Sequence, residues 1–542
     1  MRPPSWLTFA NVHWASLAIL AAVIPWSTAL ISNAQLLLAL NWIAWGIHDR
    51  DLLKRFRKVF TDRWALLFLS FWALHVLGLL WTKDLDWGLD LVRILLPLPI
   101  LCIMLFGVPR LSLERLWWVL RAGAWSVVIS TVVCLVVGWE ALRAGDHRGL
   151  SLFVSHVRLG LLLVLAIAVF LWRRPNGARW WYAQVAGASW AFAYLFLSGN
   201  INSLLILGAV LFAWLWRGVS FLPPAGRWFV RVGSLFIPAG ASVAVLNFLL
   251  APNDMPPLDA GSLPYRSAGG EIYYHNTEDP QVENGHYVWI QVADDELARG
   301  WNARSSIRFN ANDRKGQVLR GTLVRYLASK GLTKDSVGLL SLTDEDVERI
   351  ENGLPSVMTG RRGMLMERLG QLRMELDRYR TLGDPNGHSL TMRFAYWQAG
   401  WSIAKDNLLV GVGTGDTVPA FARAYEASDS VLRPEWRHRA HNQFLTLLIS
   451  FGVLGLLWSL FSWIAPAWHF KAFRSTIFVS WAIIFALSCL TEDTLETQVG
   501  ATFFGFYYCL LVFAAPMAAG SGRVNPGLNG GAGPLPVGSG PG

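Results

Sequence analysis

Long apolar runs separated by short polar segments occupy most of the chain. Windows long enough to cross a bilayer can be centred near residues 23, 40, 72, 98, 128, 165, 188, 209, 240, 454, 482 and 508. The second and eighth windows are short, and Arg93 lies inside the fourth. The pattern predicts about twelve membrane-spanning helices, with helices 1–9 in residues 1–251 and helices 10–12 in residues 441–519.

The composition agrees with this pattern. Hydrophobic residues make up 53% of the chain, charged residues only 15%, and 29 residues are tryptophan, which is far from the average of soluble domains. We therefore predict an all-α polytopic membrane protein. The segment from Met1 to Trp14 lacks a small-residue cleavage site, so the first helix is predicted to be a retained signal anchor.

Basic residues are concentrated in every second loop between the predicted spans. These loops contain residues 50–58, then Arg110 and Arg115, then Arg173, Arg174 and Arg179, then Arg217, Arg227 and Arg231, and finally Lys471 and Arg474. Because short basic loops stay in the cytoplasm, both chain termini are predicted to be cytoplasmic. This topology and anionic lipid headgroups explain the net charge of +10. No basic-aromatic motif indicates a nucleic-acid partner.

The same topology places a polar insert, residues 252–440, on the outer face of the membrane, which is the periplasm in a Gram-negative cell. The insert is large enough to form a small domain, and we predict that it is mostly helical. All four cysteines of the chain lie in predicted spans, so disulfides do not stabilise the insert. They are Cys102, Cys134, Cys489 and Cys509.

Local patterns predict the elements of the insert. A β-like run covers residues 286–292. Thr343, followed by three acidic residues, predicts the start of a helix that ends at Gly353. Further amphipathic helices are predicted at residues 364–380 and 391–405. At the end of the chain, the Gly- and Pro-rich residues 520–542 predict a disordered cytoplasmic tail.

Five groups of polar residues are predicted to lie at the outer membrane surface. They are Lys83, Asp84 and Asp86; Asp146, His147, Arg148, His156 and Arg158; Arg393 and Trp397, one helical turn apart; Arg437, Arg439, His441 and Asn442; and Glu492, Asp493 and Glu496. Several arginines and a histidine on one surface suit an anionic, lipid-linked substrate. Arginine stays charged at any working pH, so it can stabilise a phosphate leaving group without a metal.

Each group also has a structural interpretation. Arg158 can extend to lipid headgroups, His441 can make a single interfacial hydrogen bond, and Glu492 and Glu496 can cap helices or pair with nearby cations. Residues 84–86 match the D-x-D pattern of metal-nucleotide glycosyltransferases, a short pattern that often arises by chance. Residues 411–415 (GVGTG) follow a predicted helix, which favours a tight turn over a phosphate-binding loop.

Several motifs together resemble the O-antigen ligase superfamily. They are residues 393–397 (RFAYW), 406–413 (DNLLVGVG), 440–445 (AHNQFL), 451–456 (FGVLGL) and 490–496 (LTEDTLE), and their order and spacing are typical of that family. The chain departs from the family pattern at two places. Asn407 stands where a proline is usual, and residues 198–200 (SGN) stand where many relatives have Ser-Arg, so no arginine role is carried over there.

The resemblance implies a membrane glycosyltransferase of the GT-C type, which joins a polysaccharide from undecaprenyl pyrophosphate to the lipid A-core oligosaccharide. His441 is the implied catalytic base, and Arg148, Arg158 and Arg393 are candidates for binding the pyrophosphate. Further candidate substrate-binding residues are Asn442, Trp397, Lys83, Arg439 and Glu492. No cofactor and no metal ion are expected. The implied location is the bacterial inner membrane, with the active site facing the periplasm.

Two alternatives remain open at this stage. An O-antigen polymerase, or an O-oligosaccharyltransferase that acts on protein, differs only in the acceptor. A polyprenyl-lipid transporter is a different class of protein, and transporters tend to carry ionisable groups near the bilayer midplane. Here the charged residues cluster at the outer rim, with Arg93 as the main exception, which favours the enzyme.

Overall fold

The computed structural model describes residues 8–143, 147–175, 177–251, 258–279, 281–359 and 364–516. The predicted tail at residues 520–542 lies outside these ranges. The amino-terminal helices are α1 (Phe9–Val23), α2 (Thr28–His48), α3 (Leu52–Thr61), α4 (Arg63–Leu77), α5 (Leu85–Ile94), α6 (Pro97–Phe106), α7 (Leu113–Val137), α8 (Trp139–Arg143), α9 (His156–Trp172), α10 (Ala178–Leu197), α11 (Ile201–Gly218) and α12 (Pro224–Leu250).

The remaining helices are α13 (Asp294–Arg304), α14 (Leu319–Ser329), α15 (Ser336–Leu340), α16 (Asp344–Glu351), α17 (Met364–Leu382), α18 (Ser389–Asp406), α19 (Thr417–Ala427), α20 (Gln443–His469), α21 (Thr476–Thr491) and α22 (Gln498–Tyr508), which a π-helical turn extends over Cys509–Ala514. The described part contains one two-stranded sheet, in which β1 (Val282–Glu283) pairs antiparallel with β2 (His286–Tyr287). The protein is therefore all-α apart from this hairpin.

Each predicted apolar window falls on a helix, as predicted. Seven described segments are long and apolar enough to cross a membrane, namely Thr28–His48, Arg63–Trp81, Leu85–Phe106, Leu113–Val137, Ile201–Gly218, Pro224–Leu250 and Gln443–His469. Four apolar helices are shorter: Phe9–Val23, His156–Trp172, Thr476–Thr491 and Gln498–Ala514. The prediction of a polytopic membrane protein is confirmed, while the number of about twelve spans stays a prediction.

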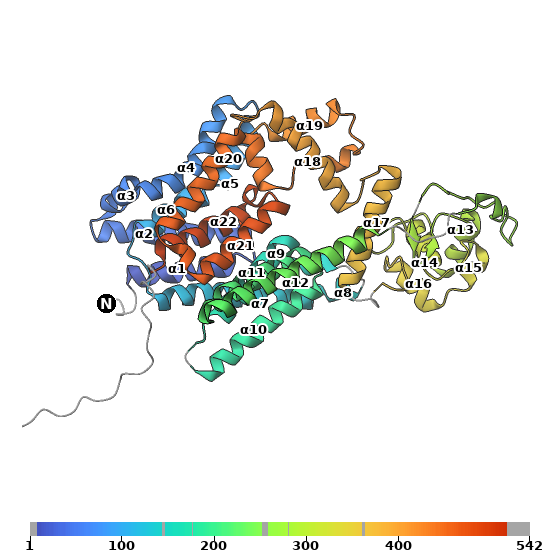
Figure 1. Cartoon of the computed structure of the whole chain (residues 1–542), viewed down its shortest axis with the longest axis horizontal. Coiled ribbons are helices and arrows are strands. Elements are labelled where there is room, and N and C mark those ends of the chain that lie inside the picture. Colours follow the sequence, from blue (N-terminus) through green and yellow to red (C-terminus); the bar gives the residue numbers. More distant parts are fainter. Residues whose placement is uncertain are drawn as a thin grey trace, which may run out of the picture.

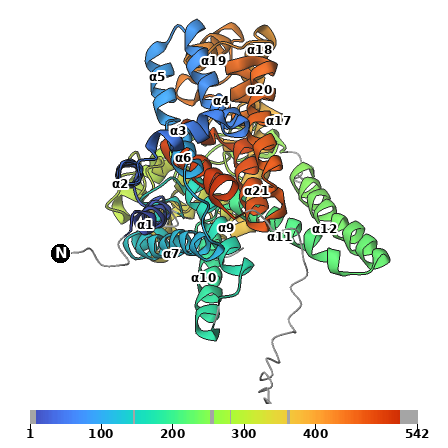
Figure 2. The same cartoon turned by 90° about the vertical axis from the view of Figure 1, so that its left-hand side faces the viewer.

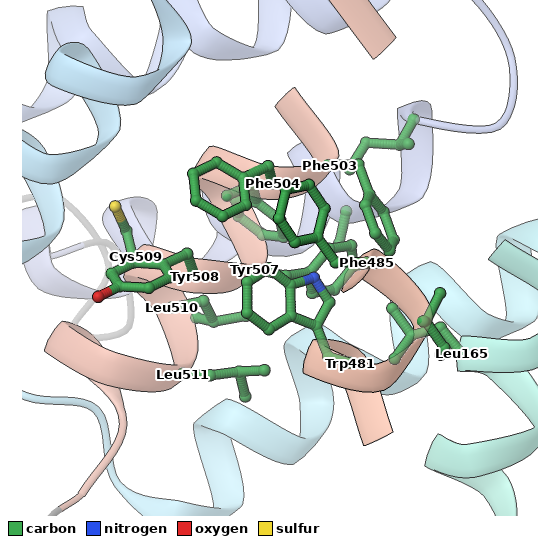
Figure 3. Packing of buried hydrophobic residues seen from close by; sticks show 14 of the residues in the cluster. Leu165, Trp481, Phe485, Phe503, Phe504, Tyr507, Tyr508, Cys509, Leu510 and Leu511 are labelled. Atoms are coloured by element: carbon green, nitrogen blue, oxygen red, sulfur yellow. The ribbon is translucent and has the colours of Figure 1, made fainter. Parts of the chain in front are cut away.

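Aromatic side chains fill the centre of the helix bundle, where α21 and α22 meet (Figure 3). The rings of Trp481 and Phe485 stack 5.8 Å apart, and Phe485 and Phe504 lie 4.4 Å apart. Lipid tails are as apolar as these side chains, so van der Waals packing and interhelical hydrogen bonds hold such helices together. Close ring packing therefore provides much of the contact that orders this part of the bundle.

Indole-to-hydroxyl hydrogen bonds join several pairs of helices. Trp190 donates to Thr131 (2.9 Å), Trp214 to Ser480 (2.8 Å) and Trp458 to Ser70 (2.9 Å). Each bond satisfies a polar group that would be costly to leave unpaired in the bilayer. These bonds explain part of the unusual tryptophan content.

Helix α12 stands to one side of the bundle (Figure 2), and only 6% of its apolar window is buried. Its main contacts within the described residues are with the short turn that precedes it and with α17. At its outer end, Arg373 of α17 lies over the Phe248 ring, 5.5 Å from the ring centroid. Most of this helix is therefore exposed to lipid.

The segment predicted to lie on the outer face, residues 252–440, contains described residues of two separately packed parts. Residues 258–359 have a hydrophobic core of their own around Trp301 and Leu323, and they lie beyond α17 at one end of the molecule (Figure 1). Helices α18 and α19 form a second core with the first turns of α20. The second part, and not the first, therefore adjoins the outer end of the bundle.

The helix predictions in this segment are largely confirmed. Thr343 caps α16 with a capping box, and Gly353 follows its end with a φ of 68°. Helices α17 and α18 cover the ranges predicted for them. The prediction of a strand over residues 286–292 is wrong beyond Tyr287. Gln291 adopts a φ of 54°, which interrupts the extended backbone, and Val292 makes isolated bridges to Tyr274 and Lys334 instead of extending the hairpin.

Helix α20 is broken at Gly452, where φ is 63° and ψ is −171°. Residues 408–413 pair with the broken helix, since Val412 N–H donates to the Ile449 carbonyl (2.9 Å) and Val453 N–H donates to the Leu408 carbonyl (2.7 Å). A Cβ at Gly452 would lie 2.2 Å from the Leu409 carbonyl carbon. The break therefore requires glycine, and residues 411–415 form a tight turn packed on helix backbone, as predicted, and not a phosphate loop.

The orientation derived from the basic loops is directly testable. A periplasm-active reporter fused after residue 320 is expected to be active, because this position belongs to the outer segment, and the same reporter fused after Lys58 is expected to be inactive. Alkaline phosphatase activity of the two fusions measures this, with a cytoplasm-active reporter at each site as the control. Cytoplasmic activity of the fusion after residue 320 would reverse the orientation.

Candidate active site

His441 lies at the N-terminal end of α20, immediately before the N-cap residue Asn442. Its φ of 47° is in the left-handed region, which is uncommon for a residue other than glycine. Ala440, just before it, is fully buried, and its carbonyl accepts a hydrogen bond from the Trp397 indole (3.0 Å). The backbone around His441 is therefore fixed on both sides, while 38% of its side chain stays accessible.

The Glu492 carboxylate lies beside the His441 ring. Its Oε2 is 3.6 Å from His441 Nδ1, and its Oε1 is 3.6 Å from a guanidinium nitrogen of Arg393. One carboxylate therefore links the histidine that precedes α20 to an arginine of α18. Because the carboxylate faces Nδ1, the other ring nitrogen, Nε2, is left to face a substrate.

Two polar residues in the first turn of α20 hold the loop that carries Glu492. Gln443 Oε1 accepts the N–H of Leu495 (2.7 Å), and the Thr446 hydroxyl donates to Asp493 (2.6 Å). Gln443 and Thr446 are both nearly inaccessible, so these bonds form away from water and are correspondingly valuable. They fix the loop after α21 against the mouth of α20, and so fix Glu492 beside His441.

Arg393 and Trp397 lie one turn apart on α18, as the sequence indicated, and both reach the same region. Arg393 donates to the carbonyls of Ser389 (3.1 Å) and Thr491 (3.4 Å), in addition to its contact with Glu492. Trp397 holds the backbone in front of His441. The two side chains thus have different roles in the structure, one electrostatic and one positional.

Arg158 approaches the group from α9. It donates to the Ser155 hydroxyl (3.0 Å) and interacts electrostatically with Glu492. It also lines a small pocket of about 10 Å³ together with Leu161, Val499 and Phe503. The structure therefore gathers Arg158 of α9, Arg393 of α18 and His441, which precedes α20, around Glu492.

Arg439 is engaged on the opposite flank of the 437–442 loop. It pairs with Glu496, and its guanidinium lies over the Trp87 ring of α5, 5.1 Å from the centroid. The Glu496 side chain is only 5% exposed, which favours the ion-pair interpretation of this acid. Its partner Arg439 is consequently less available to a substrate than Arg158 or Arg393.

Asn442 and Lys83 differ from the site residues above. Asn442 Oδ1 accepts the N–H groups of Phe444 and Leu445, both at 3.1 Å, and so caps α20. Lys83 contacts α19 through its backbone N–H, which donates to Asp416 (2.9 Å). No contact between described residues joins the Lys83 side chain to His441.

Arg148 and Asp146 cannot be placed in this group, because the Arg148 side chain and the whole of Asp146 lie outside the described residues.

The D-x-D residues serve the local fold. Asp84 is the N-cap of α5 and accepts the Trp87 N–H (3.0 Å), and Asp86 lies in the first turn of the same helix. Acidic residues at these positions stabilise a helix start. Within the described parts of the chain, no group of three or more His, Cys, Asp or Glu residues is arranged to hold a metal ion.

The hydrogen bonds of Gln443 and Thr446 to the 492–496 loop were not predicted from the sequence. The available signal was their spacing, since polar residues three apart at the start of an apolar helix lie on one face. Asp416 was also missed. Its Oδ1 accepts the backbone N–H groups of Lys83 and Asp84, which joins α19 to the loop before α5.

Residues 357–460 match the family model described as O-antigen ligase. The match covers α18, α19 and the broken part of α20, and so includes Arg393, Trp397, His441 and Asn442. No curated protein matches the chain. This match supports the resemblance to the O-antigen ligase superfamily that the motifs indicated.

Proposed function

We propose that this protein is an O-antigen ligase of the GT-C type, which moves a polysaccharide from undecaprenyl pyrophosphate to a sugar hydroxyl of the lipid A-core oligosaccharide. One observation carries the proposal: His441, inside the matched segment, shares the Glu492 carboxylate with Arg393. A base and a cation are thereby held in fixed relation at the mouth of a membrane helix. These are the two groups that glycosyl transfer from a lipid pyrophosphate requires.

In the proposed reaction, the acceptor hydroxyl oxygen attacks the anomeric carbon of the donor sugar. The new C–O bond forms as the bond from carbon to the pyrophosphate oxygen breaks, and its electron pair stays on that oxygen. His441 Nε2 takes the hydroxyl proton. Glu492 stabilises the imidazolium that results and holds the ring through Nδ1. A single displacement of this kind inverts the anomeric configuration.

Arg393 and Arg158 are proposed to bind the departing pyrophosphate. Guanidinium groups present paired donors that match phosphate oxygens, and they need no metal ion to do so. Arg393 is held by two carbonyls and by Glu492, which fixes its position before the substrate arrives. Arg148 remains a further candidate from the sequence.

Both lipid substrates are proposed to enter sideways from the outer leaflet of the bacterial inner membrane. Arg158 borders an apolar surface formed by α9 and α22, both apolar helices. An arginine at the end of an apolar surface suits a pyrophosphate attached to a polyprenyl chain. The active site would then face the periplasm, and membrane lipids would surround the bundle.

Arg93, the main observation in favour of a transporter, does not act as an unpaired charge in the membrane. Its guanidinium makes two hydrogen bonds with Asp90, one turn away on α5 (2.9 and 2.6 Å), and both side chains are well exposed. The pair is local to one helix and has no second helix as a partner. It therefore gives no support to an ion or substrate pathway through the bundle.

Deletion of the gene tests the proposed function and its acceptor. We expect long-chain lipopolysaccharide to disappear while undecaprenyl-linked polymer accumulates, because donor synthesis precedes ligation. Complementation with the wild-type gene is the control. Loss of the polymer itself would indicate a polymerase instead, and unchanged lipopolysaccharide with altered glycoproteins would indicate a protein O-oligosaccharyltransferase.

The Glu492→Gln variant is expected to reduce kcat about tenfold, equivalent to about 1.4 kcal/mol of transition-state stabilisation. Glutamine keeps the shape but loses the charge that stabilises the protonated His441. Glu492→Asp should recover part of the loss, because it restores the charge. Steady-state kinetics of the purified variants measure this. A kcat equal to that of the wild type in Glu492→Gln would remove Glu492 from the mechanism.

A further inference from the structure

A cleft of about 480 Å³ opens beside His441, and neither Arg158 nor Arg393 lines it. One wall is formed by α19, through Val418, Phe421, Ala422, Tyr425 and Glu426. The other wall is formed by the following loop, through Pro434, Arg437, His438 and Arg439. His441 and Asp493 complete the lining. Its volume is within the range of sites that hold small organic ligands. The proposed function leaves this cleft without an assigned ligand.

The lining of the cleft has the mixed character that a saccharide requires. Phe421 and Tyr425, whose ring centroids lie 5.9 Å apart, are only 3% and 2% exposed, so they form the apolar base of the cleft and give it a fixed shape. Glu426 is exposed and can accept hydrogen bonds from hydroxyl groups. The Tyr425 hydroxyl donates to the His438 carbonyl (2.5 Å), so the aromatic wall and the loop are fixed together.

Arg437 is the cation of the cleft that is free to bind an anion. Only its Nε is engaged in a described contact, as a donor to the Leu432 carbonyl (3.0 Å), and no described carboxylate lies within ion-pair distance. Arg439, in contrast, is paired with Glu496. Burial and the neighbouring His441 lower the pKa of His438, which favours its neutral form. The Arg437 guanidinium therefore provides the fork that suits a phosphate or carboxylate group.

The position of His441 decides which substrate occupies the cleft. In a displacement at the anomeric carbon, the nucleophile and the leaving group lie on opposite faces, and the base must lie with the nucleophile. His441 lines the cleft, whereas Arg158 and Arg393, the proposed partners of the leaving group, do not. We infer that the cleft between α19 and the 434–441 loop binds the acceptor saccharide, and that Arg437 selects a sugar with an anionic substituent beside the accepting hydroxyl.

The inference that the acceptor saccharide occupies the cleft rests on the proposed function. The first experiment distinguishes a failure of this inference from a failure of the proposed function. Ala422 and Ala427 are both exposed alanines of α19, but only Ala422 lines the cleft. The Ala422→Trp variant should fill the cleft and raise the KM for a core lipooligosaccharide acceptor about tenfold or more, with the KM for the undecaprenyl-linked donor unchanged. Ala427→Trp is the matched control and should behave as the wild type.

An unchanged acceptor KM in Ala422→Trp, or an equal rise in both KM values, would overturn the inference. Absence of transfer by the wild type would instead contradict the proposed function. In that case, the affinity of the lipooligosaccharide for the protein in lipid nanodiscs tests whether the cleft binds the acceptor. The inference expects Ala422→Trp to weaken binding about tenfold relative to Ala427→Trp, and equal affinities would contradict it.

The role of Arg437 is tested with two acceptors, the intact lipooligosaccharide and the same material after removal of its phosphates. Arg437→Gln should weaken binding of the intact acceptor about tenfold, as expected when a charged hydrogen bond is lost, and should leave binding of the dephosphorylated acceptor within about twofold. Arg437→Lys should be intermediate. Arg433→Gln is the control, since Arg433 is exposed on the same loop but does not line the cleft. An equal loss with both acceptors would refute the charge-selective role.

Discussion

Replacement of His441 with alanine is expected to reduce polymer transfer by about 10²- to 10⁴-fold, the usual contribution of a general base. The side chain is 38% exposed and lies at the rim of the bundle, so its truncation opens no cavity in a hydrophobic core. The helix cap is made by Asn442 and does not depend on the imidazole. The variant should therefore fold and insert normally.

The measurement is the rate of transfer by the purified variant, with its melting temperature and membrane yield as checks on folding. His286→Ala is a suitable control, because His286 is an exposed histidine of the hairpin in residues 258–359. A His441→Ala protein that retains more than about a tenth of the wild-type rate would show that His441 is not the base.

The Arg393→Lys variant is expected to reduce turnover by about 10- to 100-fold, in proportion to the ~1.5–3 kcal/mol of a hydrogen bond to a charged group. Lysine keeps the positive charge but has no planar fork. It cannot reach the Thr491 carbonyl and the Glu492 carboxylate as the guanidinium does, and it offers no paired donors to a pyrophosphate. The effect should appear in kcat, because the charge on the leaving group develops in the transition state.

Arg423→Lys provides the matched control, since Arg423 is an exposed arginine of the neighbouring helix α19. Steady-state kinetics with saturating donor and acceptor measure both variants. Wild-type turnover in Arg393→Lys would mean that a simple positive charge is sufficient there, and the account of paired donors to the pyrophosphate would be wrong.

The helical elements were predictable from local patterns. Apolar runs long enough to cross a membrane located the helices of the bundle, and the capping box at Thr343 with Gly353 located α16. These features depend on residues within one or two turns of each other. The run at residues 286–292 does not continue as a strand because Gln291 adopts a φ of 54° and Val292 bridges to Tyr274 and Lys334, pairings that local alternation does not encode.

The candidate site was predictable as a set of residues but not as an arrangement. The motifs placed His441, Arg393 and Glu492 on one membrane surface, yet the pairing of Glu492 with both partners depends on Gln443 and Thr446 contacting a loop about fifty residues away along the chain. No local periodicity encodes such a contact. The break at Gly452 has the same origin, because the amide partners of the broken helix come from residues 408–413.

The structure also separates residues that the sequence grouped together. Arg439 and Arg393 have the same charge and the same predicted location. Arg439, however, is paired with a nearly buried carboxylate and lies over an indole. Arg393 instead shares an accessible carboxylate with His441. Likewise, Asp84 resembles a metal ligand in sequence and is a helix cap in the fold. Only the three-dimensional contacts distinguish these roles.

Transfer by the purified wild-type protein in excess EDTA tests the central claim most directly. The protein, in lipid nanodiscs, is given an undecaprenyl pyrophosphate-linked polysaccharide and a lipid A-core acceptor, and the ligated product is quantified. Because His441 is proposed to provide the base and arginines the positive charge, we predict the same rate with and without EDTA. Loss of transfer in EDTA, with recovery on addition of magnesium or manganese, would contradict the account.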